Sequence, residues 1–401
     1  MRGLRMRKMG LIALALILFI SSVPAQTETA NEDYVKAMTT ADPAQRANLL
    51  KEYLTKYAGK GTQYENYANG NLCLLAYQGK TAEETINYGE KALALGGLDD
   101  LIKCQILITL SGIYGERGQN LEKAKSYASQ AAEIAKANGG KESEEKGRTS
   151  WEKLLGYAYF AQGQAFDKAK DAKSAVGPYI ESYKILNDKQ ILINLKKVGK
   201  TLYEFKFYNE AEKAFAIVAE VFKDFESYSL YARILHRTGK KNEALKYYKM
   251  AYMKQKSGET AFNIGIIEAE NAKSNPALAQ EALQYFLDAS FLSAAHSQKA
   301  MGLAEDLFFN YLNKDLKYNE KAKELQERST KLEELTKTFN EKFGEKNEED
   351  LTEAEKKEMQ NLNAQIESEK KAIQKLGDEQ KLALDKWNVQ IEEAKKRLGI
   401  K

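Results

Sequence analysis

The amino-acid sequence predicts an all-α chain that is built from paired amphipathic helices. Only 4 of its 401 residues are proline, and Ala, Leu, Glu and Lys, which all favour helices, are abundant. Over residues 195–218, apolar side chains recur at helical spacing on both sides of a short polar turn at 206–210. Two short helices of this kind cannot bury their apolar faces alone, so each pair needs copies of itself as neighbours.

This stretch shows the pattern most clearly. Its first helix carries Leu195, Val198, Gly199 and Leu202, and its second carries Ala211, Phe215 and Val218. The arrangement resembles tetratricopeptide repeats (TPR), in which bulky, small and bulky residues precede an Ala-x3-aromatic-x2-small helix. The resemblance implies a TPR-like α-solenoid, in which Gly199 and Ala211 occupy positions where two helix backbones approach closely.

The small residue of each second helix recurs along the chain. These positions are Thr85, Ala124, Ala175, Ala211, Ala244 and Ala282. Their separations are 39, 51, 36, 33 and 38 residues, against an ideal of about 34. We therefore predict about six helix pairs over residues 61–312. The long second interval predicts an extended connection before the helix of Ala175, and Asn275-Pro276 predicts a lengthened last turn.

Residues 1–25 have the features of a secretory signal peptide. A positive head precedes an apolar run at 10–20, and Val23-Pro24-Ala25 resembles a cleavage site. The head consists of Arg2, Arg5, Arg7 and Lys8. We expect cleavage after Ala25 and export to the periplasm or the outer membrane, with an uncleaved membrane anchor as the alternative. Residues 26–60 then form the mature N-terminus and a helix that Pro43 opens after Asp42.

Removal of this leader changes the charge of the chain. The full sequence has a net charge of +4, and the leader carries four basic residues and no acidic ones. The mature chain is therefore near neutral and has no global attraction for nucleic acid. Its cysteines, Cys73 and Cys104, fall about two helical turns out of step on neighbouring first helices. That offset favours two buried free thiols over a disulfide.

Residues 313–401 differ in composition from the repeats. They are dense in Glu and Lys, with sparse apolar residues at heptad-like spacing. A break at 344–350 and a capping box at Thr352 and Glu355 separate two long helices, and Gly377-Asp378 is expected to interrupt the second. We predict that these two helices form an antiparallel helical hairpin. A self-associating coiled coil and a partly disordered tail are the alternatives.

The sequence offers little for catalysis. Its two histidines, His236 and His296, are far apart, and HExxH, CxxC and GxSxG motifs are absent. Two Gly-Lys-Thr triplets resemble the end of a phosphate-binding loop, but Leu74 and Asn194 stand where its first glycine is required. We expect no enzyme activity, cofactor, metal or small-molecule substrate. A hidden pair of catalytic glutamates is the remaining alternative.

The resemblance to TPR proteins implies that ligand-facing residues lie on the first helix of each repeat. Carried onto the best-aligned repeats, these residues are Lys153, Tyr157, Phe160, Lys196, Lys200, Tyr203, Arg233, His236, Arg237 and Phe262. Cations with interleaved aromatics suit an acidic peptide or a C-terminal carboxylate. Lys200 stands where the co-chaperone carboxylate clamp has asparagine, so clients of that clamp are not expected. The alternative to partner binding is that these cations only contact solvent.

Together these features predict a non-catalytic protein–protein interaction scaffold of the cell envelope, which binds a partner segment in the solenoid groove. The alternative is a structural subunit of a larger envelope assembly. In that case residues 313–401 are the oligomerisation element.

Overall fold

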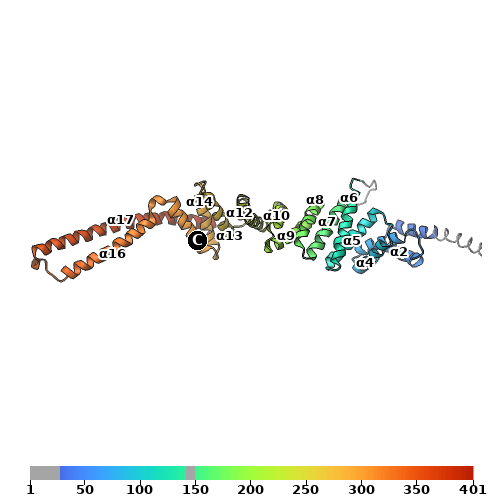
Figure 1. The fold of residues 1–401 in the computed structure, drawn as a ribbon, viewed down its shortest axis with the longest axis horizontal. Coiled ribbons are helices and arrows are strands. Elements are labelled where there is room, and N and C mark those ends of the chain that lie inside the picture. Colours follow the sequence, from blue (N-terminus) through green and yellow to red (C-terminus); the bar gives the residue numbers. More distant parts are fainter. Residues whose placement is uncertain (1–27, 141–149, 401) are drawn as a thin grey trace, which may run out of the picture. The chain divides into compact units, whose positions relative to one another are not determined.

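The computed structural model describes residues 28–140 and 150–400, which are helical almost throughout and include no β-strand (Figure 1). The predicted signal peptide at 1–25 lies outside the described residues. The chain divides into two compact units, with the boundary after Val218. Within the described residues, no helix is both long and apolar enough to cross a membrane.

The first unit is a succession of helices joined by short turns. It contains a helix at 28–39, α2 (Pro43–Tyr57), α3 (Glu65–Gln78), α4 (Ala82–Leu95), α5 (Asp100–Arg117), α6 (Leu121–Ala137), α7 (Trp151–Lys168), α8 (Ala172–Leu186), α9 (Lys189–Glu204) and most of α10 (Tyr208–Phe222). Consecutive helices from α2 to α9 pack together, and α5 also contacts both α3 and α7. The first helices α3, α5 and α7 therefore form one layer of the stack.

Glycines on the first helices allow each pair to pack closely. A Cβ at Gly163 of α7 would lie 2.7 Å from the Tyr179 ring of α8, and one at Gly199 of α9 would lie 2.9 Å from the Phe215 ring of α10. Ala211 and Phe215 are fully buried. The expected role of Gly199 is confirmed, and the fold is a TPR-like α-solenoid.

Two details of this unit differ from expectation. The connection between α7 and α8 spans only residues 169–171, so the extended connection predicted there is wrong. The extra residues lie before α7, in the segment between Ala137 and Trp151.

At the N-terminus, a helix at 28–39 precedes the helix that the sequence predicts after Asp42. Asp42 caps α2 by accepting the Gln45 N–H at 2.7 Å, as the sequence predicts.

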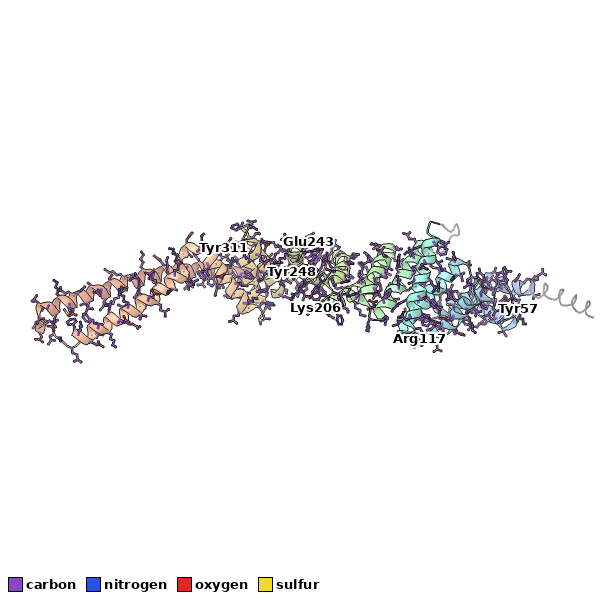
Figure 2. The ribbon with its side chains drawn as sticks, in the orientation of Figure 1. Tyr57, Arg117, Lys206, Glu243, Tyr248 and Tyr311 are labelled. Carbon is purple, nitrogen blue, oxygen red and sulfur yellow. The ribbon has the colours of Figure 1, made fainter. Side chains whose placement is uncertain are left out.

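The second unit begins in the last turns of α10. It continues with α11 (Phe225–Arg237), α12 (Lys241–Lys254), α13 (Gly258–Asn271), α14 (Leu278–Leu292), α15 (Ser297–Asp306), a π-helix η1 (Leu307–Leu312), the 3-10 turns η2 (Lys314–Leu316) and η3 (Glu348–Asp350), and the long helices α16 (Tyr318–Phe343) and α17 (Glu353–Leu398). The same glycine–aromatic packing joins Gly265 of α13 to Phe286 of α14. Tyr248 of α12 is buried, whereas Tyr311 lies at the surface and donates its hydroxyl to the Ala272 carbonyl (Figure 2).

The two long helices α16 and α17 lie side by side and antiparallel (Figure 1). Lys321 pairs with Glu379 at 2.6 Å near the base of this hairpin, and Lys342 pairs with Glu358 near its tip. The predicted capping box of Thr352 is present. The predicted interruption at 377–378 is wrong because a single glycine in a helix costs only about 1 kcal/mol, which side-chain packing offsets. The helix continues unbroken through it.

The C-terminal half of α17 returns to the end of the helix stack. Trp387 of α17 packs against Phe308 and Phe309 of η1, with ring centroids 5.2 and 5.8 Å away. These residues share one core cluster with Phe286 of α14. The base of the hairpin therefore completes the core of the second unit. The predicted domain ranges 61–312 and 313–401 stay a prediction.

Candidate partner-binding site

A hollow of about 440 Å³ opens on the first helices of the first unit. Its walls come from α3, α5 and α7, together with the end of α8 and the start of α9. The lining residues are Tyr77, Ile108, Thr109, Gly112, Glu116, Tyr157, Phe160, Ala161, Gln164, Leu186, Asp188, Gln190 and Ile191. Four helix pairs therefore contribute to one concave site, as expected for a stack whose first helices form a layer.

Aromatic side chains dominate the rim of this hollow. Tyr77 is 47% exposed and Tyr157 is 46% exposed, both high values for such large side chains. Phe160 is half-buried and packs on Tyr179 of α8, with ring centroids 6.0 Å apart. The opposite face of α7 is buried, so this helix holds Tyr157 and Phe160 in place. The two rings lie one turn apart and face the same hollow.

The charged groups of the hollow are acidic. Its lining contains the carboxylates of Glu116 and Asp188 and no lysine or arginine. Asp188 also caps α9, because its Oδ1 accepts the Gln190 N–H at 2.8 Å. The side-chain amides of Gln164 and Gln190 complete the polar lining. A site of this kind offers apolar contact area with a few oriented polar groups, which is the usual composition of a recognition pocket.

The structure brings some predicted site residues of the first unit together. Tyr157 and Phe160 share the hollow, whereas Lys153 lies one turn before Tyr157 and is exposed. Lys196 and Lys200 lie further along α9, one turn apart, and do not line the hollow. The ring of Tyr203 packs on Tyr208 at 5.7 Å.

In the second unit, the predicted site residues are largely engaged within the protein. Arg233 of α11 forms an ion pair of 3.3 Å with Glu259 of α13. The half-buried His236 meets Tyr248 edge-on; burial and nearby Lys241 lower the pKa of its imidazole.

The remaining two predicted residues of this unit differ from one another. Arg237 is exposed on the last turn of α11. Phe262 packs against Phe286 at 6.1 Å and His296 at 4.9 Å, and it belongs to the rim of the hydrophobic core.

Sequence reasoning missed Tyr77, Ile108, Glu116, Asp188 and Ile191. The ligand-facing positions were carried only onto the best-aligned repeats, which begin at α7. The degenerate repeats of α3 and α5 are not among these, although they supply five of the thirteen lining residues. No signal in the sequence separates Tyr77 from an ordinary surface tyrosine, because single exposed aromatic side chains are common on protein surfaces.

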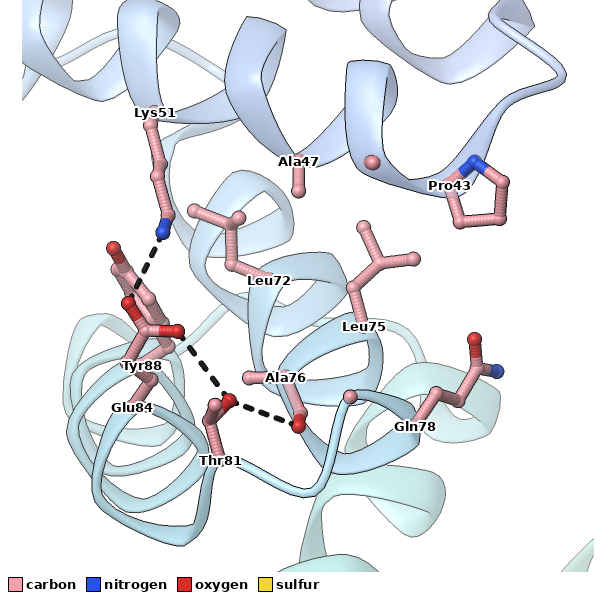
Figure 3. A pocket seen from close by; sticks show the side chains of 12 residues that line it. Pro43, Ala47, Lys51, Leu72, Leu75, Ala76, Gln78, Thr81, Glu84 and Tyr88 are labelled. Atoms are coloured by element: carbon pink, nitrogen blue, oxygen red, sulfur yellow. Dashed lines mark hydrogen bonds and ion pairs between the residues drawn. The ribbon is translucent and has the colours of Figure 1, made fainter.

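A second hollow of about 490 Å³ lies between α2, α3 and α4. Figure 3 shows Leu72 and Leu75 of α3 pointing toward α2. At one end, Lys51 donates to Glu84 at 3.0 Å, and the Thr81 hydroxyl bonds to the same carboxylate (Figure 3). The Lys51–Glu84 pair links α2 to α4 across the gap, so this hollow is a feature of helix packing.

Metal-ligating side chains do not cluster in the part of the chain that the structure describes. No cluster of three or more His, Cys, Asp or Glu side chains is placed there to hold a metal ion. Cys73 and Cys104 are both buried and free, as the sequence predicts. Burial raises the pKa of each thiol to about 12, so neither is a ready nucleophile.

Comparison with known proteins identifies neighbours in structure alone. No protein-family model matches this chain, and no curated protein matches it. A tetratricopeptide repeat protein from Parabacteroides merdae is 14% identical, with 70% of this chain and 98% of that chain covered at a TM-score of 0.33. The apo form of RapI is 13% identical, covering 78% and 99% at 0.32. The TPR2AB domain of yeast Sti1, in a complex with pHSP90, is 16% identical, covering 61% and 98% at 0.26. The fold assignment above rests on the helix pairs themselves.

Proposed function

We propose that this chain is a non-catalytic protein–protein interaction scaffold, which binds a segment of a partner protein in the hollow of its first unit. The observation that carries this proposal is the exposure of Tyr77 and Tyr157 around an apolar floor. Tyrosines on rigid helices give large contact areas at low entropic cost, which makes them frequent anchors of interfaces.

The shape of the site favours a chain segment over a small molecule. The hollow is lined by residues from five helices and is bordered by the exposed side chains of Tyr77 and Tyr157. Lys153, one turn before Tyr157 on α7, is exposed, and we propose that it contacts an acidic residue of the partner outside the hollow. In the second unit, Arg237 is the candidate for such a contact, being exposed.

The basic head and apolar run of residues 2–20 support a further part of the proposal, which is export of the chain. On this view the scaffold acts in the periplasm or at the outer membrane.

A peptide-display library screened against the mature chain, residues 26–401, tests the binding proposal. The double variant Tyr77→Ala/Tyr157→Ala is expected to weaken selected peptides at least 10-fold, because it removes both exposed anchors. Phe205→Ala is the matched control, since Phe205 is 69% exposed and lies outside the hollow. Equal binding by the double variant and the unchanged chain would overturn the proposal.

A structural subunit that assembles through its C-terminal helices is the second candidate. Leu382 and Val389, seven residues apart on α17, favour it because they are 56% and 53% exposed. The seam between α16 and α17 is already closed within the chain, where Glu369 is buried beside Arg328 and Lys331. Sedimentation of the intact chain separates the two views. An oligomer that Leu382→Lys/Val389→Lys converts to monomer supports the subunit, and a monomer throughout excludes self-assembly by this surface.

A further inference from the structure

We infer that the hollow of the first unit selects a partner segment that carries an arginine or lysine next to an apolar side chain. This inference rests on the proposed function and specifies the chemistry of its ligand. It concerns the same thirteen lining residues and reverses the charge that the sequence had suggested for the partner.

The first argument is charge complementarity. Glu116 and Asp188 supply two carboxylates to the lining, and no cationic side chain balances them there. Their basic sequence neighbours, Arg117 and Lys189, are not among the lining residues. A cation of the ligand therefore meets two carboxylates and no competing cation in the lining. A hydrogen bond from a charged donor to a carboxylate contributes more than a neutral one, so this interaction favours a basic side chain.

The second argument comes from the position of Glu116. It lies in the last turn of α5, Asp100–Arg117, where the helix dipole disfavours negative charge. Glu116 is exposed and lines the hollow, where a bound cation would offset this unfavourable dipole interaction.

The third argument concerns the rings. Tyr77 and Tyr157 present exposed aromatic faces, which attract guanidinium and ammonium groups. Ile108, Leu186 and Ile191 provide an apolar floor beside them. A segment with one cation and one adjacent apolar side chain satisfies both parts of the site. An acidic residue in the hollow would face the two carboxylates and be repelled.

The expectation of an acidic partner depended on Lys196, Lys200, Arg233 and Arg237. None of these cations lines the hollow, and Arg233 is paired with Glu259. An acidic stretch of a partner therefore has no cation to meet in the hollow.

Three sets of acetylated, amidated peptides test the inference on the mature chain. The sets are identical except for a central Arg-Leu, Gln-Leu or Glu-Leu, and the flanking sequence is taken from the display selection. We expect the Arg-Leu set to bind at least 10-fold tighter than the Glu-Leu set. The variant Glu116→Gln/Asp188→Asn should abolish this preference. Asparagine also caps helices well, so α9 should stay intact.

A matched charge control is Glu83→Gln/Glu133→Gln, which removes two exposed carboxylates outside the hollow and should retain the preference. Equal binding of the three sets, or tighter binding of the Glu-Leu set, overturns the inference. If the three sets bind equally but Tyr77→Ala/Tyr157→Ala still abolishes their binding, the proposed function stands and only the inference about charge fails. Failure of the tyrosine variant to affect any set overturns both.

Discussion

Arg397, in the last turn of α17, donates from Nη2 to Oδ1 of Asp288 on α14 across 2.7 Å. Asp288 is only 4% exposed, and its other oxygen accepts the Tyr252 hydroxyl, also at 2.7 Å. Lys256 in turn donates to the main-chain carbonyl of Arg397. The C-terminal turn of α17 is therefore bonded to the helix pairs of the second unit through the buried carboxylate of Asp288.

Removal of this guanidinium should destabilise the second unit. Arg397→Ala leaves the buried Asp288 with the Tyr252 hydroxyl alone, so we expect a loss of about 1–3 kcal/mol in the free energy of unfolding. Urea unfolding followed by circular dichroism measures it. Lys395→Ala is the control on the same turn, because it breaks only a surface pair with Glu392 and should change stability by less than about 0.5 kcal/mol. Equal effects of the two variants would contradict the role of Asp288.

Close packing at the glycine of a first helix gives a second prediction. In Gly199→Ala the new Cβ would lie 2.9 Å from the Phe215 ring and 3.0 Å from Ala214 Cβ. Both neighbours are fully buried, so we expect a net loss of about 1–2 kcal/mol despite the better helix propensity of alanine. Gly112→Ala on α5 is the control, because its Cβ would meet no atom within 4 Å.

Thermal unfolding of both variants decides this point. Gly112→Ala should be as stable as the unchanged chain or up to about 1 kcal/mol more stable, since it gains propensity without a clash. A stable Gly199→Ala would show that the helix backbones of this pair do not need their close approach.

The sequence predicted the fold because the repeat carries redundant signals. Helical periodicity, Gly199 against Phe215, and the small residues of the second helices all indicate the same packing. The return of α17 onto α14 was not predictable from these patterns. Arg397 and Asp288 are 109 residues apart, and nothing in the local composition of either helix indicates that they meet. The heptad-like stripe of α17 fits both a hairpin and a self-associating coil.

The candidate site was only partly predictable for a related reason. Tyr157 and Phe160 lie on a well-aligned repeat, and the structure places both in the hollow. Tyr77 and Glu116 lie on degenerate repeats, where a ligand-facing position could not be assigned. Charge counted along α9 and α11 suggested a basic groove. Whether a cation is free depends on its spatial neighbours, as the pair of Arg233 with Glu259 shows.

Burial of the two cysteines gives a third prediction. Burial raises the pKa of both Cys73 and Cys104 to about 12, against about 8.5 for an ordinary cysteine. At pH 8 the thiolate fraction is then lower by roughly 10³, so an aromatic disulfide reagent should react with the native chain roughly 10³-fold more slowly than with the urea-unfolded chain. Two thiols should react per unfolded chain. Fewer than two after unfolding without reductant would indicate a disulfide and contradict the free thiols.

Acid stability provides the last prediction, which concerns Glu90 on α4. Burial alone would raise the pKa of its carboxyl, but hydrogen bonds from Tyr114 at 2.6 Å, Lys123 at 3.0 Å and Tyr127 at 2.9 Å outweigh burial and hold the pKa below its usual value. The folded state then binds fewer protons than the unfolded state, so this stabilisation is complete above about pH 4.3 and is lost as pH falls through the lowered pKa. Glu90→Gln should cost about 1 kcal/mol at pH 7 and progressively less below pH 4. Urea unfolding at pH 7, 5 and 3 measures the difference, with Glu122→Gln, at an exposed position, as the control. A cost for Glu90→Gln that is the same at pH 7 and pH 3 would show that the carboxylate charge does not hold α4 to α5 and α6.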